Sequence, residues 1–305
     1  MTLAPGSAAV DPRIVAGTDY GASDGEWRRV EWRAHRRSVE LDGARVEYAE
    51  LGAGEPLLFV HGLSGCWRNW LENLPHFGAG HRAVALDLPG FGASPMPSWP
   101  VEMATYGRLI HEFCEALGLE GATLVGNSMG GLIAAEAATT RPELYRRLVL
   151  VSAAGIINTW QPEARVAATA WAWKRFGESV AARGGRLLAR ARTREALLGP
   201  LVRYPNQLAI DLLWEQLDGG LPCPAFGDAL RALIHHDSRE RLAAIELPTM
   251  VLWGLDDRIV PVAAGLSYHR RIPGSRLEVF ERTGHVPMFE RPLRFNAVLD
   301  DFLAG

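Results

Sequence analysis

A serine between two glycines is the first feature of the sequence that could perform chemistry. Residues 126–130 read Gly-Asn-Ser-Met-Gly and join a short apolar run, 122–125, to an alanine-rich segment that begins at Met129. A strand, a sharp turn and a helix in this order would present the hydroxyl of Ser128 as a nucleophile. Serine is also favoured at the start of a helix, so Ser128 could instead be a helix cap. A chain of this composition contains the bare pattern by chance about one time in eight, so other residues must decide between the two interpretations.

Candidate partners of such a serine follow two later apolar runs. A nucleophilic serine needs a base, and the base needs an acid that orients it. His285 follows the last strand-like run of the chain, and Asp256 and Asp257 follow the run before it. Because the carboxyl ends of parallel strands meet at one edge of a sheet, we expect these side chains to lie near the serine.

Two backbone N–H groups are predicted to stabilise the negative charge that develops on a substrate oxygen. One belongs to Met129, the residue after Ser128. The other comes from the loop that follows the apolar run 56–60, at Leu63 or Ser64. This is the arrangement that a nucleophile on a strand-to-helix turn requires.

The composition is that of a soluble globular protein. The chain has 305 residues, of which 48% are hydrophobic and 22% are charged, and its formal net charge is −3. No overall positive field therefore attracts nucleic acid or anionic lipid. The three cysteines, Cys66, Cys114 and Cys223, are too widely spaced to indicate a disulfide framework or a metal site. No apolar run is long enough to span a membrane, and the N-terminus lacks the pattern of a secretory signal, so we expect a cytoplasmic protein.

No metal ion and no organic cofactor are expected. The adjacent His235 and His236 would point to different faces of a helix, which argues against a metal site there. The expected partner is a small-molecule acyl substrate. We expect no nucleic acid, no transmembrane segment and no peripheral membrane contact.

Short strands and amphipathic helices alternate along most of the chain. Two alternating runs around Asp42-Gly43 predict an antiparallel hairpin, and the later apolar runs suit strands that are buried on both faces of a parallel sheet. The sequence therefore predicts the α/β class, with a doubly wound, mostly parallel sheet behind a leading antiparallel hairpin. We expect an N-terminal arm at 1–37, mobile over its first 25 or so residues, a core at 38–155 and 241–305, and an inserted helical cap at 156–240.

Several short motifs between residues 61 and 285 belong together. They are His61-Gly62, Asp87 to Gly92, Gly126 to Gly131, Gly254 with Asp257 and Pro261, and Gly284-His285. In these motifs the chain resembles the α/β-hydrolase fold superfamily, in its branch of capped serine esterases and meta-cleavage C–C hydrolases. The resemblance extends from about residue 38 to the end of the chain. It implies a catalytic triad of Ser128, Asp257 and His285. It also implies oxyanion-hole N–H groups on Met129 and Leu63, and structural roles for His61 and Asp87.

The chemistry implied is hydrolysis of a carboxylic ester with an apolar or aromatic acyl group, through an acyl-enzyme. Meta-cleavage C–C hydrolases, thioesterases and lactonases stay open as alternatives. Meta-cleavage hydrolases commonly carry Trp directly after the catalytic His, whereas this sequence has Val286, which weakens that alternative. Epoxide hydrolases and haloalkane dehalogenases carry Asp in place of Ser128. A non-catalytic hydrolase-fold receptor can keep the same residues, and it is the alternative from another functional class. The pocket candidates are Ser64, Trp160, Trp214 and Val286.

Overall fold

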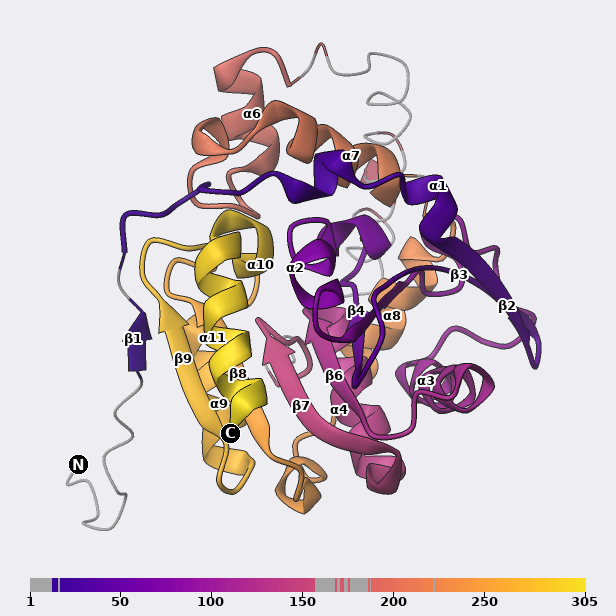
Figure 1. Ribbon diagram of the computed structural model, residues 1–305. Coiled ribbons are helices and arrows are strands. Elements are labelled where there is room, and N and C mark those ends of the chain that lie inside the picture. Colours follow the sequence, from indigo (N-terminus) through magenta and orange to yellow (C-terminus); the bar gives the residue numbers. More distant parts are fainter. Residues whose placement is uncertain are drawn as a thin grey trace, which may run out of the picture.

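The computed structural model describes residues 13–15, 17–156, 168, 171–172, 175, 186, 188–221 and 223–305. These residues contain a nine-stranded sheet with the strand order β1-β9-β8-β7-β6-β4-β5-β3-β2 (Figure 1). The strands are β1 (Arg13–Val15), β2 (Arg36–Leu41), β3 (Ala44–Leu51), β4 (Pro56–Val60), β5 (Arg82–Leu86), β6 (Ala122–Asn127), β7 (Tyr145–Val151), β8 (Thr249–Gly254) and β9 (Arg276–Phe280).

The sheet is parallel except at one edge. The pairs from β5 through β4, β6, β7, β8 and β9 to β1 are all parallel. The hairpin β2–β3 is antiparallel, and β3 pairs antiparallel with β5. The predicted fold class, a mostly parallel α/β sheet with a leading antiparallel hairpin, is confirmed.

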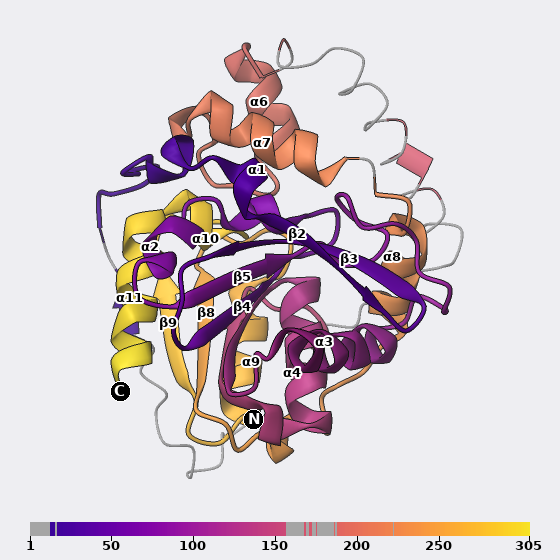
Figure 2. The same ribbon diagram turned by 45° about the vertical axis from the view of Figure 1, so that its right-hand side comes forward.

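Helices cover both faces of the sheet (Figure 2). The α-helices are α1 (Trp32–His35), α2 (Leu74–Gly78), α3 (Met103–Leu117), α4 (Met129–Thr140), α6 (Ala191–Leu198), α7 (Ile210–Gly220), α8 (Phe226–His235), α9 (Val262–Arg271), α10 (Pro287–Glu290) and α11 (Pro292–Ala304). Short 3-10 helices are η1 (Glu26–Arg29), η2 (Trp67–Trp70), η3 (Pro142–Leu144), η5 (Pro205–Gln207) and η6 (Leu242–Ala244).

Alternate side chains of the strands enter two separate hydrophobic cores. In β4, Leu58 and Val60 join the core that includes α3, α4 and α9. Leu57 and Phe59 join the core that includes α2 and α11. Successive side chains of a strand point to opposite faces, so a continuous apolar run such as β4 is stable only when both faces are covered. Packing on both faces fixes the positions of the central strands, including their carboxyl ends.

The described part of the N-terminal region packs on the core, whereas the sequence predicts a mobile arm over the first 25 or so residues. β1 extends the sheet by pairing with β9. From there the chain crosses the molecule to α1, between α7 and α10 (Figure 1). Trp27 is buried and donates a hydrogen bond from Nε1 to Glu72 at 2.9 Å, and the Trp32 ring contacts the Trp67 ring. Large aromatic side chains in this polar segment gain enough by burial to hold it on the domain.

Between β7 and β8 the described residues form helices and loops and no strand. Figure 1 places α6 and α7 beyond the carboxyl ends of β7 and β9. The helix α8 packs near α3. Trp160, one of the predicted pocket residues, lies outside the described residues.

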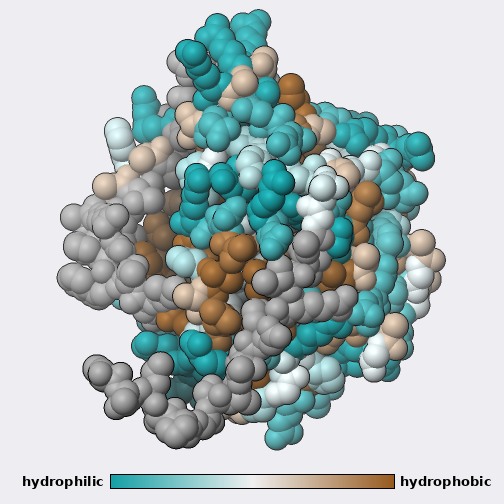
Figure 3. All heavy atoms as spheres, turned by 90° about the vertical axis from the view of Figure 1, so that its left-hand side faces the viewer, coloured by the Kyte–Doolittle hydropathy of each residue, from teal (hydrophilic) through white to brown (hydrophobic). Residues whose placement is uncertain are grey.

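Few of the large hydrophobic side chains that the structure describes are exposed. Figure 3 shows one face of the molecule, on which hydrophilic residues surround a group of hydrophobic ones. In the part of the chain that the structure describes, no helix is long and apolar enough to cross a membrane.

Candidate active site

Ser128 lies at the turn between β6 and α4. Its backbone has φ 55° and ψ −118°, a region that costs a non-glycine residue roughly 1–3 kcal/mol and that occurs mainly at functional sites. Two neighbouring glycines permit this turn. A side chain at Gly126 would overlap the carbonyl oxygen of Gly130, and a side chain at Gly130 would overlap the carbonyl oxygens of Val60 and His61. The glycines therefore let α4 begin directly against the end of β4.

The hydroxyl of Ser128 does not cap α4. No side-chain hydrogen bond of Ser128 serves as a cap among the described residues of this helix. Met129 is the first residue of α4, so its N–H has no partner inside the helix. Leu63 follows β4 and lines the same cavity as Ser128. Met129 therefore adjoins Ser128 and Leu63 lies at the cavity, and the role of their N–H groups as oxyanion donors stays a prediction.

His285 and Asp257 form a buried pair. The Nδ1 atom of His285 lies 2.7 Å from Oδ2 of Asp257, and the two residues are 3% and 6% exposed. The other carboxylate oxygen of Asp257 accepts hydrogen bonds from the N–H groups of Ile259 at 2.8 Å and Val260 at 2.9 Å. Because this carboxylate can only accept, Nδ1 of His285 carries the proton and Nε2 keeps a free lone pair. A histidine held in this tautomer can act as a base.

Asp256 has a different environment. Its carboxylate accepts a hydrogen bond from Nε of Arg203 at 2.8 Å, and its side chain is 37% exposed. The two adjacent carboxylates therefore have different partners: Asp257 contacts His285, and Asp256 forms a surface ion pair with Arg203.

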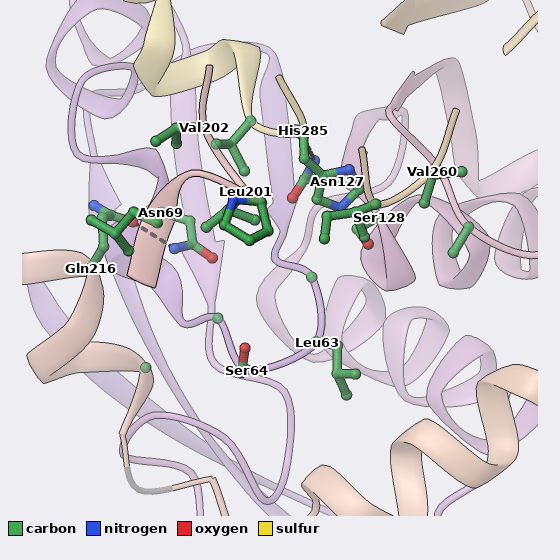
Figure 4. A pocket seen from close by; sticks show the side chains of 18 of the residues that line it. Leu63, Ser64, Asn69, Asn127, Ser128, Leu201, Val202, Gln216, Val260 and His285 are labelled. Carbon is green, nitrogen blue, oxygen red and sulfur yellow. Dashed lines mark hydrogen bonds between the residues drawn. The ribbon is translucent and has the colours of Figure 1, made fainter. Parts of the chain in front are cut away.

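Ser128 and His285 line one cavity of about 720 Å³. Figure 4 shows both residues with Asn127 at one side of this cavity, and Asn69 with Gln216 at the other side. In the described part of the chain, Asp257 is the one hydrogen-bond partner of the His285 ring. Catalytic hydrogen bonds are often long in the free enzyme and tighten when the substrate binds.

Apolar side chains form most of the described cavity wall. They come from α6, the loop after it, α7, α8, the loop after β8 and the loop after His285. The polar side chains in the wall include Ser64, Asn69, Asn127 and Gln216. The amide of Asn69 donates to Oε1 of Gln216 at 2.6 Å. Such a wall suits a mostly apolar ligand with few polar groups.

Of the predicted pocket residues, Ser64 and Val286 line the cavity and Trp214 does not. The helix α7 turns Leu213, Gln216 and Leu217 toward the cavity, a stripe with the spacing of one helical face. Trp214 lies on the neighbouring face and packs, half-buried, against the core shared with α2 and α11.

The family model described as the alpha/beta hydrolase fold matches residues 55–292. The chain belongs to this family. It is 33% identical to the dihydrolipoyllysine-residue acetyltransferase component of the acetoin cleaving system of Cupriavidus necator, over 88% of this chain and 68% of that protein. It is 30% identical to the 2-hydroxy-6-oxo-6-phenylhexa-2,4-dienoate hydrolase of Comamonas testosteroni, over 87% and 93% of the two chains. Among solved structures, a bacterial membrane phospholipase A has a TM-score of 0.72 and 27% identity, and the match covers 92% of this chain and 90% of that one.

Two buried groups hold the loops around the site of this α/β hydrolase. Nε2 of His61 accepts a hydrogen bond from the N–H of Leu88 at 2.9 Å, so its Nδ1 donates to the carbonyl of Gly62 at 2.7 Å. Burial lowers the pKa of His61 from 6.5 to about 4, which keeps the ring neutral. The carboxylate of Asp87 accepts from the N–H groups of Trp67 and Ala93. Burial raises the pKa of Asp87 to about 6.

Two residues near His285 were not singled out by the sequence analysis. Asn127 donates from Nδ2 to the carbonyl oxygens of Val151 at 3.1 Å and His285 at 3.2 Å. Glu290 is fully buried and accepts hydrogen bonds from both residues that flank His285. Nothing in the spacing of the sequence around Glu290 shows that its carboxylate is buried. Among the described residues, no group of three His, Cys, Asp or Glu side chains is placed to hold one metal ion.

Proposed function

We propose that this α/β hydrolase cleaves carboxylic esters of apolar or aromatic acyl groups through an acyl-enzyme, with Ser128, His285 and Asp257 as its catalytic triad. One observation carries the proposal. The buried 2.7 Å pair of His285 and Asp257 leaves Nε2 of the histidine free, in the cavity that the strained Ser128 also lines.

In this mechanism His285 removes the proton of the Ser128 hydroxyl as the oxygen attacks the carbonyl carbon of the ester. Asp257 keeps the imidazole in the required tautomer and stabilises the imidazolium. The N–H groups of Met129 and Leu63 donate to the oxyanion, and in other enzymes one such donor is worth roughly 10²–10³ in rate. His285 then protonates the leaving alcohol, and a water molecule activated by the same base hydrolyses the acyl-enzyme.

The cavity wall supports a neutral acyl group as the substrate. The described lining is rich in Leu, Ile, Val and Phe and contains no Lys or Arg. A carboxylate in this wall would lose its hydration without gaining a cation from these residues, which is strongly unfavourable. We further propose that residues 156–240 form a cap over the site, since the part of this segment that the structure describes supplies Leu213, Leu217 and Leu233 to the wall.

A second candidate reaction is the hydrolysis of a C–C bond in a meta-cleavage product. The observation in its favour is the 30% identity to the Comamonas testosteroni dienoate hydrolase over 93% of that protein. Nucleophile, base and oxyanion donors would be shared by both reactions, so the substrate decides between them. The apolar side chains in the described part of the cavity wall favour an ester over the dienoate, which carries a carboxylate.

Turnover of a substrate panel tests the proposal. The panel contains p-nitrophenyl esters of graded chain length and a 2-hydroxy-6-oxo-dienoate, each assayed with the wild type and with Ser128→Ala. We expect multiple turnovers on an apolar ester, and a loss of about 10⁴-fold or more in Ser128→Ala with unchanged thermal unfolding. Preference for the dienoate would favour the second candidate. Covalent labelling of Ser128 by a fluorophosphonate without turnover of any substrate would favour a non-catalytic receptor.

A further inference from the structure

The buried carboxylate of Glu290 lies beneath the loop that carries His285. Its Oε2 atom accepts hydrogen bonds from the N–H of Gly284 at 2.9 Å, the N–H of Arg203 at 2.8 Å and the hydroxyl of Tyr20 at 2.8 Å. Its Oε1 atom accepts from the N–H of Val286 at 3.1 Å. Three segments that are far apart in the sequence therefore meet on one side chain.

The four partners fit the ionised form of Glu290. The backbone N–H groups can only donate. The hydroxyl of Tyr20 accepts a hydrogen bond from the N–H of Tyr204 at 2.8 Å, so its own proton is directed to Glu290. Burial raises the pKa of Glu290, and the four donors act in the opposite direction. A protonated Glu290 could donate among these partners only to the hydroxyl of Tyr20, which would then have to give up its own hydrogen bond to Glu290.

These hydrogen bonds hold the backbone on both sides of His285. Gly284 and Val286 are its direct neighbours, and both amides point to the same carboxylate. The N–H of His285 itself donates to the carbonyl of Leu201 at 2.9 Å. The backbone around the histidine is thus fixed at three successive residues, which leaves the imidazole little freedom beyond its own side-chain torsions.

The N-terminal segment closes this arrangement from outside. The N–H of Gly21 donates to the carbonyl of Glu290 at 2.8 Å. The buried Arg291 donates to the carbonyl of Gly17 at 3.0 Å and to the carboxylate of Asp19 at 2.8 Å. Residues 17–21 therefore contact the turn after His285 through both backbone and side chains.

We propose that Glu290 is a positioning residue for His285 and that Tyr20 completes its set of donors, so that residues 17–21 are a working part of the active site. The inference rests on the proposed serine-hydrolase function. In this proposal Glu290 acts through the loop of His285 and does not contact the substrate. It sets the angle at which Nε2 of His285 meets the hydroxyl of Ser128.

Glu290→Gln is the sharpest perturbation of this arrangement. The amide oxygen of the glutamine retains the most hydrogen bonds when it takes the place of Oε2, which has three donors. The new NH₂ group then faces the N–H of Val286, and this one bond is lost. We expect kcat to fall about 10–100-fold with KM within about threefold of the wild type, because small misplacements of a catalytic group cost about this much.

Tyr20→Phe removes one donor to Glu290 from a different segment, together with the acceptor of the Tyr204 N–H. We expect the same signature at a smaller size, about 3–10-fold in kcat, since three donors to Glu290 stay in place. The rate of fluorophosphonate labelling of Ser128 should fall by the same factor as kcat, because labelling needs the base but no bound substrate.

Glu72→Gln is the matched control. Glu72 is also buried and binds the same N-terminal region, through the hydroxyl of Ser23 and Nε1 of Trp27. Among the described residues, its side chain has no hydrogen bond to the loop of His285. We expect it to lower the melting temperature and to leave kcat and the labelling rate within about twofold of the wild type.

Two results would overturn the inference. One is a kcat within about twofold of the wild type in Tyr20→Phe and in any folded Glu290→Gln protein, and the other is an equal loss of kcat in Glu72→Gln. If Glu290→Gln does not fold, Tyr20→Phe against Glu72→Gln still decides. Full activity of Ser128→Ala would instead refute the proposed function itself, so the two failures are distinguishable.

Discussion

Replacing Asp257 by asparagine should reverse the proton position on His285 without changing the shape of the site. One carboxylate oxygen of Asp257 accepts from the N–H groups of Ile259 and Val260, and the other contacts Nδ1 of His285 at 2.7 Å. An asparagine side chain has only one oxygen, so this oxygen can face either the two backbone N–H groups or His285, but not both. If the amide oxygen kept the histidine, its NH₂ group would face two backbone donors, at the cost of two hydrogen bonds.

Each such bond contributes about 0.5–1.5 kcal/mol, so the amide oxygen stays with Ile259 and Val260. The NH₂ group then donates to Nδ1 of His285, and the ring proton moves to Nε2. The imidazole can no longer accept the proton of Ser128. A wrong tautomer in this type of triad costs about 10⁴ in kcat, which corresponds to about 5.5 kcal/mol of transition-state stabilisation.

The assay compares kcat and KM for the best p-nitrophenyl ester in the wild type, Asp257→Asn and Asp256→Asn. The last variant is the matched control, because Asp256 is 37% exposed and bound to Arg203. A surface ion pair contributes about 0–1 kcal/mol, so Asp256→Asn should stay within about fivefold of the wild type. Both variants should unfold at nearly the wild-type temperature.

The proposed role of Asp257 fails if Asp257→Asn keeps more than about a tenth of the wild-type kcat while it remains folded. It also fails if Asp256→Asn loses as much activity as Asp257→Asn. The second result would make Asp256 the orienting acid and would require a rearranged loop after β8.

Two further predictions concern stability. The pKa of His61 falls from 6.5 to about 4 on folding. Between these two values the ring is protonated in the unfolded chain and neutral in the folded chain. The contribution of His61 to stability is therefore lost as the pH falls, by about 2 kcal/mol between about pH 7 and about pH 5. Because Asp87, whose pKa is raised to about 6, and all other groups are present in both proteins, urea unfolding should show a change between the two pH values that is less favourable by about 2 kcal/mol in the wild type than in His61→Gln. Equal changes in both proteins would contradict this prediction. Gly130→Ala should destabilise by about 3 kcal/mol, since the new methyl group overlaps the carbonyl oxygens of Val60 and His61. Gly80→Ala, where no atom lies within 4 Å of the new methyl group, should stay within about 1 kcal/mol in the same thermal unfolding experiment.

The central sheet was predictable because its strands are buried on both faces. Such strands need continuous apolar runs, and β4, β6 and β8 have them. β1 has three residues, Arg13 to Val15, in a segment rich in glycine and alanine. A strand this short has no detectable periodicity, and only its pairing with β9 shows that it belongs to the sheet.

Glu290 illustrates a limit of a different kind. A glutamate near the C-terminus of the chain is usually solvated. Here its environment depends on Tyr20 and Arg203, which lie far away in the sequence and approach it only in the folded chain. No local pattern around Glu290 carries this information.

The residues of the proposed triad and the residues of the cavity wall depend on different kinds of information in the sequence. Ser128 directly follows β6, and Asp257 follows the last residue of β8, Gly254, after a very short loop. Short connections leave little conformational freedom, so the position of a residue after a strand nearly fixes its place at the sheet edge. In α7, by contrast, spacing shows which residues share a face but not which face is turned inward. Leu213 and Trp214 are neighbours in the sequence, and packing alone decides that the leucine lines the cavity and the tryptophan does not. Spacing along the strands therefore supports the proposed triad, whereas the identity of the substrate requires the substrate panel.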